Sequence, residues 1–165
     1  FAKIPTARKQ KFNLASHIMK VIELYENDNR VTIRFDKGNC DDLYVNADRE
    51  QLSRAFINLI KNGIQAIPPE REGIIEIIMK RRDHMVVISV ADNGSGIPEE
   101  LREKMFSPNF TTKTSGMGLG LAIVKNIVEN FSGRIWYETI TNIGTTFYLE
   151  IPVFEEAEND TGNNY

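Results

Sequence analysis

Residues that build covalent or metal-based frameworks are scarce in this sequence: its 165 residues include one cysteine and two histidines. The single thiol, that of Cys40, excludes an internal disulfide and a metal centre made of several cysteines. No apolar run approaches the roughly 20 residues of a membrane-spanning helix, and no signal peptide opens the chain. We therefore expect a cytoplasmic domain that makes no membrane contact.

An excess of positive charge is also absent, since the formal net charge is −3. Proteins that bind the nucleic-acid backbone usually present a basic face, so we expect no nucleic-acid partner. With 41% hydrophobic and 26% charged residues, the composition is that of one ordinary globular domain with a real core.

Regular periodicity is confined to the middle of the chain. Residues 1–12 have no clear period, and residues 155–165 lack a core-forming pattern. We expect a lead-in segment, a domain over residues 13–154 and a disordered tail. Because the chain begins at Phe1, we also expect it to be a piece of a longer protein.

Hydrophobic periodicity predicts three helices and several strands. The helical segments are 14–26, 48–67 and 119–131. Asn13 and Asp48 are suitable N-caps, and Gly133 stands just past the last helix. A β-branched strand is predicted over residues 31–35, and hairpins are predicted around residues 81–84 and 141–144. The result is an α+β two-layer sandwich, in which helices cover one face of a mixed, mostly antiparallel sheet.

The helix predicted over residues 48–67 carries a row of amides beside its apolar side. Asn58 and Asn62 stand one turn apart, and Gln51 lies in the same stripe. A buried amide without a partner costs about 1–3 kcal/mol, so each should meet a neighbouring loop, water or a ligand. An amide oxygen suits Mg²⁺, which also binds phosphate oxygens. Lys61 points furthest from the apolar side, and we expect it to be solvated.

A second candidate, DNGSGIP (92–98), follows a predicted buried strand. Asp92 stands at the exit of that strand and should point inward, where a carboxylate needs donors. The EF-hand pattern fails because its third and fifth positions are Gly94 and Gly96. The segment is either a surface turn at an Asn-Gly step or a place where a carboxylate faces an amino-bearing ligand.

A third candidate is the glycine-rich segment that precedes the last helix. Gly116, Gly118 and Gly120 alternate there, and two threonines and Lys113 precede them. Free N–H groups at a helix N-terminus attract anions, although a loop of this composition is otherwise merely flexible. The P-loop and dinucleotide-binding patterns are both absent. Taken together, a polyanion site, an amide ligand for Mg²⁺ and a buried carboxylate describe a site for ATP.

The order of these motifs resembles the GHKL (Bergerat-fold) ATP-binding domain, specifically the catalytic domain of bacterial sensor histidine kinases. NLIKNGIQAI (58–67) is similar to the N box of that family, and DNGSGIP (92–98) to its G1 box. FSPNFTTK (106–113) is similar to the F box, and GMGLGL (116–121) to the G2 box. The resemblance spans residues 12–153, and the FTTK segment resembles the nitrogen-regulation branch.

The resemblance implies a role for each motif residue. Asn62 would bind Mg²⁺, and Asp92 would accept a hydrogen bond from the adenine amino group, with Thr145 assisting through water. The G1 glycines would form the floor of the adenine pocket. Residues 106–117 would form a mobile lid, in which Lys113 has a catalytic role. The other implied ATP contacts are Ala66, Gly94, Gly96, Ile97, Phe110, Thr111, Thr112, Gly116, Met117, Gly118, Leu119, Gly120 and Leu121.

Asn58 is the residue that favours a kinase over an ATPase. In the GHKL ATPases, the residue one turn before the metal asparagine is a glutamate that activates water, and an amide cannot act as a general base. The resemblance therefore implies that the γ-phosphate is kept for a histidine on a separate dimerisation domain, and then for a response-regulator aspartate. His17 and His84 lack the acidic residue that follows that histidine, so we expect the isolated domain to lack its acceptor.

Two other functions stay open from the sequence. One is a GHKL serine kinase of the anti-sigma type, against which the FTTK segment and the lead-in argue. The other is a non-enzymatic module that senses ATP, against which Asn62, Asp92 and the G2 glycines argue. We expect a monomer, because dimerisation would belong to the missing helices. Sensor kinases are often membrane-anchored through other segments.

Overall fold

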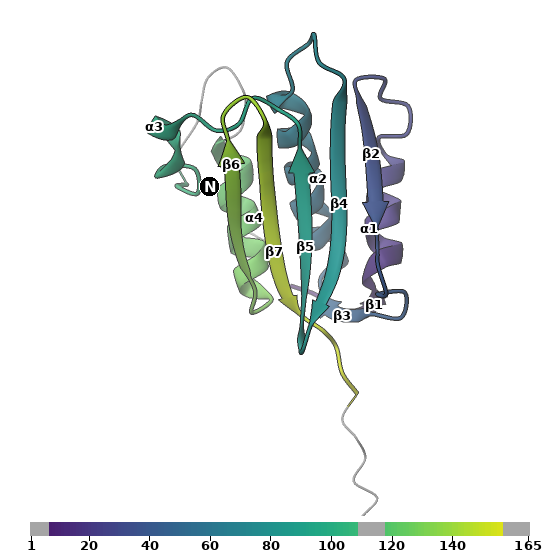
Figure 1. Cartoon of the computed structure of the whole chain (residues 1–165). Helices are drawn as coiled ribbons and strands as arrows, with labels where there is room; N and C mark the ends of the chain where they lie inside the picture. The colour runs from purple at the N-terminus through teal and green to yellow at the C-terminus, as the bar shows by residue number, and fades with distance from the viewer. Residues whose placement is uncertain (1–6, 109–117, 157–165) are drawn as a thin grey trace, which may run out of the picture.

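The computed structural model of the chain describes residues 7–108 and 118–156, and its largest element is a five-stranded sheet (Figure 1). The strands lie in the order β2 (Val31–Asp36), β4 (Gly73–Arg82), β5 (Met85–Asp92), β7 (Gly144–Pro152) and β6 (Arg134–Ile140). β2 is parallel to β4, and the other three pairings are antiparallel. The predicted mixed, mostly antiparallel sheet is confirmed.

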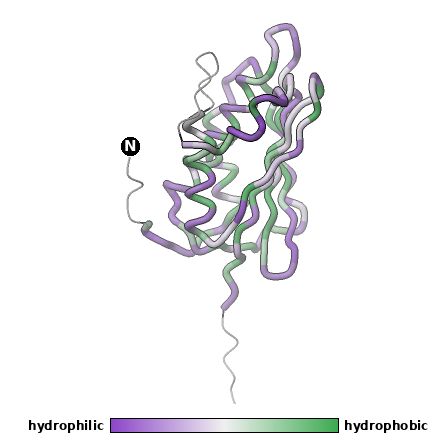
Figure 2. The backbone as a smooth tube through the Cα atoms, turned by 90° about the vertical axis from the view of Figure 1, so that its left-hand side faces the viewer, coloured by the Kyte–Doolittle hydropathy of each residue, from purple (hydrophilic) through white to green (hydrophobic). Residues whose placement is uncertain are grey.

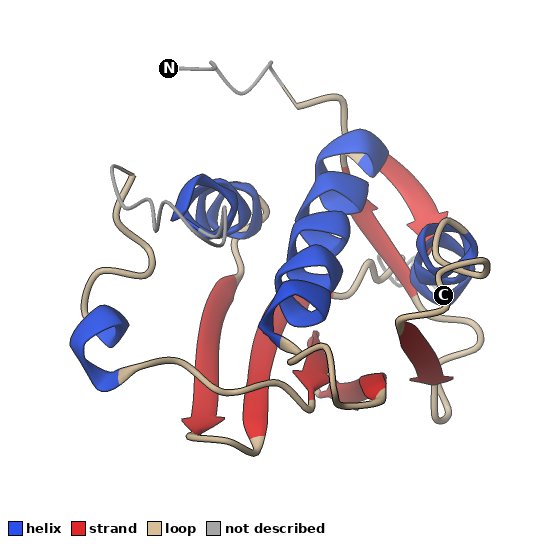
Figure 3. Cartoon of the chain, turned by 90° about the horizontal axis from the view of Figure 1, so that it is seen from above, coloured by secondary structure: helices blue, strands red, loops and turns tan. Residues whose placement is uncertain are grey.

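Helices α1 (Leu14–Glu23), α2 (Arg49–Ala66) and α4 (Gly118–Asn130) lie on one face of the sheet (Figures 1 and 3). The short helix α3 (Glu99–Arg102) lies beside the β6 edge, where the Tyr137 hydroxyl donates to the Arg102 carbonyl at 3.4 Å. The side view shows the helical layer against the sheet, with hydrophobic stretches in both (Figure 2). The predicted α+β two-layer sandwich is therefore confirmed.

Alternation along the strands explains how the core forms between the two layers. In β7, Phe147, Leu149 and Ile151 point toward the helices and are buried, whereas the intervening residues are half-buried on the open face. From the helical side, Phe56 of α2 is fully buried. Burying a side chain of this size stabilises the fold by about 1.5–3 kcal/mol.

The predicted caps set the starts of α1 and α2. The Asn13 side chain accepts a hydrogen bond from the Ser16 N–H at 2.9 Å, and Asp48 Oδ1 accepts from the Glu50 N–H at 3.0 Å. α1 ends at Glu23 rather than at the predicted residue 26. The difference arises because the N–H groups that follow bond three residues back, as in the bond from Tyr25 to Ile22, and this tightens the last turn.

The end of α4 differs from the simplest expectation for a glycine-terminated helix. Ser132, with φ 60°, adopts the left-handed conformation that ends the helix. Gly133 follows it and donates to the Val128 carbonyl at 2.9 Å. A Cβ on Gly133 would lie 2.1 Å from the Glu150 carbonyl oxygen, so a close approach to β7 requires this glycine.

Ordered structure extends into the two segments predicted to flank the domain. β1 (Gln10–Asn13) pairs antiparallel with β3 (Tyr44–Ala47) in a separate two-stranded sheet. Lys11 of β1 forms an ion pair with Glu156 at 3.0 Å, and Glu155 Oε1 lies 2.6 Å from Arg81 Nη2. The first residues of the predicted tail therefore contact the domain, and residues 157–165 lie outside the described part of the chain.

None of the helices within residues 7–108 and 118–156 is both long and apolar enough to span a bilayer.

His17 is a buried titratable group in the helical layer. Its Nε2 lies 2.9 Å from the Ser53 hydroxyl of α2, and its ring packs 4.8 Å from the Phe12 ring. Burial, together with the nearby positive charges of Arg49 and Lys20, lowers the pKa of His17 from 6.5 to about 4. The folded state therefore holds a neutral imidazole at pH values where the unfolded chain is protonated.

This burial predicts a loss of stability in acid. Above pH 6.5 His17 is neutral in both the folded and the unfolded state, so it does not change the free energy of unfolding. Between about pH 6.5 and 4, only the unfolded state binds the proton. The free energy of unfolding should fall by up to about 3 kcal/mol over that window, at about 1.4 kcal/mol per pKa unit. Urea unfolding at several pH values tests this expectation. His17→Gln should flatten this part of the profile, whereas His84→Gln, at an exposed turn, should keep it; an unchanged slope in His17→Gln would contradict the assignment.

Candidate functional site

The candidate site lies where β5 ends beside α2. Asp92 is the last residue of β5, and its Oδ1 accepts hydrogen bonds from the backbone N–H groups of Gly94 at 2.9 Å and Thr145 at 3.2 Å. A Cβ placed on Gly63 of α2 would lie 3.3 Å from the Asp92 Cβ and 3.6 Å from its Oδ2. The carboxylate therefore points toward the helical layer, as the sequence predicts.

The two oxygens of Asp92 differ in their partners. Burial raises the pKa of this carboxyl above its usual value, although the two backbone N–H groups on Oδ1 partly oppose the rise. Oδ2 accepts no hydrogen bond from the described residues. A carboxylate oxygen is an acceptor only, so Oδ2 suits a ligand that offers an N–H donor at this position.

Asn62 is the second polar group of the site. The residue is only 6% exposed, and its Nδ2 has no hydrogen-bond partner in the described part of the chain. An orphaned buried amide costs about 1–3 kcal/mol, so this position is suited to a ligand. A half-turn of the amide would place its oxygen where the nitrogen lies, which is the arrangement that a hard cation such as Mg²⁺ needs.

Asn58 connects α2 to the first turn of α4. A Cβ on Gly120 would lie 3.6 Å from the Asn58 Cγ, so the amide faces that glycine across the helix pair. Asn58 is half-buried and Gln51 is buried, which confirms the predicted stripe of amides. Lys61 is exposed on the opposite side, also as predicted. The structure thus brings the N-box and G2-box segments together.

The two glycines of the DNGSGIP segment have close neighbours within the protein. A Cβ on Gly94 would lie 2.7 Å from the Ala66 carbonyl oxygen. Gly96 has φ +79°, and a Cβ there would lie 2.8 Å from the Ile140 carbonyl oxygen. Both glycines therefore dock this segment against the end of α2 and the β6–β7 turn. Their role as the floor of an adenine pocket stays a prediction.

Thr145 and Ile97 meet in a small hydroxyl network. The Thr145 Oγ1 lies 2.9 Å from the Thr139 Oγ1, which also accepts from the Ile97 N–H at 3.0 Å. Thr145 and Ile97 are both buried, so the network fixes the segment that follows Asp92 against β6 and β7. The predicted contact of Thr145 with adenine through water stays a prediction.

The predicted phosphate contacts are only partly described. Phe110, Thr111, Thr112, Lys113, Gly116 and Met117 lie outside the described residues. Gly118 and Leu119 begin α4, and the Leu121 side chain is buried in the core, so only its backbone can face a ligand. No three histidine, cysteine, aspartate or glutamate side chains gather at one point in the described ranges. A cation beside Asn62 would therefore need oxygens of its nucleotide or water.

Two residues contact the site that the sequence did not predict there. The Arg71 guanidinium donates from Nη1 to the carbonyls of Asn93 at 2.6 Å and Gly94 at 3.0 Å. Gly63 of α2 is the other such residue, since a Cβ there would lie 3.3 Å from the Asp92 Cβ. An unexpected glycine in a helix interior is the one signal that could have indicated this close approach.

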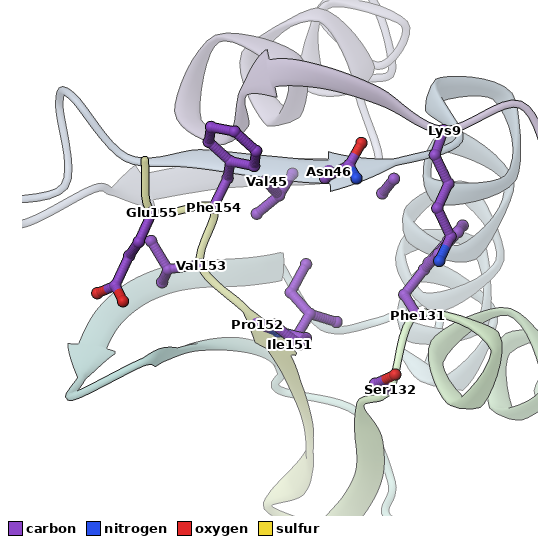
Figure 4. A pocket seen from close by; sticks show the side chains of 11 residues that line it. Lys9, Val45, Asn46, Phe131, Ser132, Ile151, Pro152, Val153, Phe154 and Glu155 are labelled. Carbon is purple, nitrogen blue, oxygen red and sulfur yellow. The ribbon is translucent and has the colours of Figure 1, made fainter. Parts of the chain in front are cut away.

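A hollow of about 310 Å³ lies elsewhere, between β3 and the residues that follow β7 (Figure 4). Val45, Phe131 and Phe154 are among its lining residues, and Lys9 and Glu155 lie at its edges. It contains none of the predicted ATP contacts and lies by the opposite end of β7 from Thr145. It is therefore separate from the candidate site.

Comparison with known proteins assigns the family. Residues 47–155 match the family of histidine kinase-, DNA gyrase B- and HSP90-like ATPases, and the chain belongs to that family. The catalytic domain of histidine kinase ThkA is 41% identical, with a TM-score of 0.78, over 88% of this chain and 95% of that one. The resemblance to sensor histidine kinase catalytic domains is therefore confirmed.

Curated relatives point to the same class. Sporulation kinase A of Bacillus subtilis is 38% identical over 88% of this chain and 24% of its own length. Sensor histidine kinase ZraS of Escherichia coli is 37% identical over 85% of this chain and 30% of its own length. The chain thus spans about a quarter to a third of the length of these relatives.

The glycine contacts predict different outcomes for two alanine substitutions. Gly94→Ala places a methyl group against the Ala66 backbone, and overpacking of this kind costs about 1–3 kcal/mol. Gly120→Ala meets only ordinary contacts with Asn58, and alanine favours a helix by up to about 1 kcal/mol. Urea unfolding of both variants measures the difference. Equal loss of stability in Gly94→Ala and Gly120→Ala would show that close packing against Ala66 does not exclude a side chain at position 94.

Proposed function

We propose that this domain binds Mg-ATP around Asn62 and Asp92 and donates the γ-phosphate to a histidine on a separate dimerisation domain. A response-regulator aspartate would then receive the phosphoryl group. The observation that carries the proposal is the arrangement of Asp92: one carboxylate oxygen is bonded to two backbone N–H groups, and the other is left for a donor.

Recognition of adenine follows from this arrangement. The exocyclic amine of adenine is an N–H donor, so it would complete the hydrogen bonding of Asp92 Oδ2. Gly63 leaves room on α2 beside that oxygen. The Thr139–Thr145 network and the docked glycine segment would keep the surrounding backbone in place while the base enters.

Asn62 and the start of α4 would receive the triphosphate. A Mg²⁺ ion bound there supplies charge neutralisation for the phosphate oxygens. The Asn62 amide would orient the triphosphate end of the nucleotide, and N–H groups in the first turn of α4 would bind phosphate oxygens. Lys113 and the threonines beside it would add charge and donors from the segment that precedes the helix.

Asn58 would preserve the γ-phosphate for transfer. It stands one turn before Asn62 and faces Gly120 at the start of α4, close to the expected triphosphate. Its amide cannot take a proton from water, so the described residues offer no general base at this position. Binding without rapid hydrolysis is what a phosphotransfer domain requires.

The acceptor and the later partner would come from outside this chain. His17 is buried against Ser53, and neither His17 nor His84 in the β4–β5 turn is followed by the acidic residue that marks the acceptor histidine of the kinases. Histidine kinase ThkA, 37% identical over 92% of this chain and 43% of its own, has been solved in complex with response regulator protein TrrA. By analogy we propose a response regulator as a partner, a cytoplasmic site of action and a monomeric isolated domain. Membership of the nitrogen-regulation branch stays a prediction.

Removing the Asn62 amide tests the proposed metal ligand. Calorimetric titration of the wild type with ATP should give saturable binding that weakens when EDTA replaces Mg²⁺. Asn62→Ala should lose at least about tenfold in affinity, or about 1.4 kcal/mol, and its binding should no longer depend on Mg²⁺. Phosphotransfer in trans to a cognate dimerisation domain should be abolished.

Gln65→Ala is the matched control, because this amide lies on the same helix and is exposed. It should bind and transfer as the wild type does. Retained transfer in Asn62→Ala would exclude Asn62 as the metal ligand. Binding without transfer in the wild type would favour the non-enzymatic ATP module.

Introducing a carboxylate at position 58 tests the kinase assignment. Asn58→Glu should raise the rate of ATP hydrolysis, since a general base contributes about a hundredfold or more in favourable geometry. Asn58→Gln keeps an amide and should remain slow. Phosphate release measured at saturating ATP gives the comparison. Flat turnover in Asn58→Glu, with ATP still bound, would refute the role given to Asn58.

A further inference from the structure

Arg71 lies in the loop between α2 and β4 and donates hydrogen bonds to the backbone that follows β5. Its Nη1 donates to two consecutive carbonyls, those of Asn93 at 2.6 Å and Gly94 at 3.0 Å. Hydrogen bonds from an ionised donor are stronger than neutral ones, and two of them fix the orientation of both peptide groups. The side chain is half-buried, so the contact is partly shielded from water.

The Asn93 side chain holds the same segment from the sheet. The last paired residues of β4 and β5 are Ile75 and Asp92. Beyond them, Asn93 Oδ1 accepts from the Ile74 N–H at 2.8 Å, and Asn93 Nδ2 donates to the Glu72 carbonyl at 2.8 Å. The Asn93 backbone N–H also donates to the Ile74 carbonyl at 3.3 Å, and the side-chain amide extends this hydrogen bonding to Glu72. Arg71 and the Asn93 side chain thus hold residues 93 and 94 from two sides.

These contacts reach Asp92 through Gly94. The Gly94 carbonyl accepts from Arg71, and the Gly94 N–H donates to Asp92 Oδ1 at 2.9 Å. Gly94 therefore helps to orient the carboxylate, together with the Thr145 N–H that donates to the same oxygen at 3.2 Å. We propose that Arg71 is a positioning residue for base selectivity: it holds Gly94 so that Asp92 presents Oδ2 to an exocyclic amine. This inference rests on the proposed binding of ATP.

The chemistry of the two purines makes the inference specific. Adenine offers an N–H donor at the position where hypoxanthine carries a carbonyl oxygen. A fixed carboxylate oxygen would bond to the first and repel the second, because both oxygens are acceptors. A loosened Gly94 would let Asp92 rotate, which weakens the bond to ATP and relieves the repulsion of inosine triphosphate. Selectivity should therefore change more than the affinity for the shared triphosphate.

The test is calorimetric titration with ATP and with inosine triphosphate, both in the presence of Mg²⁺. The wild type should bind ATP at least about tenfold more tightly than inosine triphosphate, a difference equivalent to one good hydrogen bond. Arg71→Ala should bring the ratio of the two affinities to within about threefold of unity, mainly through weaker ATP binding. Arg71→Lys keeps one charged donor and should give an intermediate ratio.

Arg81→Ala is the matched control. Arg81 also donates to a backbone carbonyl, that of Asp83 at 3.1 Å, but it lies at the opposite end of β4. This variant should keep the wild-type ratio. Melting temperatures of all four proteins show whether each remains folded.

The outcomes separate the two proposals. A wild type that binds ATP selectively, with the same ratio in Arg71→Ala, would overturn the role of Arg71 and leave the proposed function standing. A fall of both affinities by one factor would likewise assign Arg71 a merely structural role. Equal affinity of the wild type for the two nucleotides would overturn the proposal that Asp92 recognises the exocyclic amine of adenine. A wild type that does not bind ATP would overturn the proposed function itself.

Discussion

The site depends on one constraint, the burial of the Asp92 carboxylate where β5 meets α2. A carboxylate can leave water only if donors replace its hydration, and the backbone N–H groups of Gly94 and Thr145 supply them to Oδ1. Its approach to α2 leaves little space for a side chain at position 63, where a Cβ would lie 3.3 Å from the Asp92 Cβ. The glycine segment must then turn sharply enough for Gly94 to reach back to the carboxylate. Around this single group, the helix, the sheet and the loop are mutually constrained.

The register of the sheet is what makes that arrangement possible. β5 and β7 pair Ala91 with Thr146, so the start of β7 lies beside the end of β5 and Thr145 can donate to Asp92. A slip of one residue would turn every side chain of β7 to the other face and remove Phe147 from the core. Hydrophobic packing thereby fixes the geometry of a polar site. The buried Asn62 and the half-buried Asn58 extend the site along α2 toward α4 without interrupting the core.

Much of the fold could be predicted because long elements carry strong periodic signals. The alternation of β7 and the spacing of apolar residues in α2 both match their observed structures. β1 was missed because QKFN is short and mostly polar, whereas its pairing with β3 and the burial of Phe12 are tertiary contacts. Ser132 was missed as the terminating residue because glycine is the usual choice there, whereas Gly133 is required by the proximity of Glu150. Both differences arise from tertiary contacts that local patterns do not contain.

Sequence patterns predicted the long helices and strands, the order of the four motifs and the chemical types at the site: amides at 58 and 62, a carboxylate at 92 and glycines around them. These follow from local periodicity and side-chain chemistry. Three contacts become evident only in the folded chain: Asp92 Oδ1 is the oxygen already bonded, Asn58 faces Gly120, and Arg71 reaches the carbonyls of residues 93 and 94. Those contacts join segments brought together by the sheet and the helix packing. Their geometry is therefore a property of the whole fold rather than of any one stretch of chain.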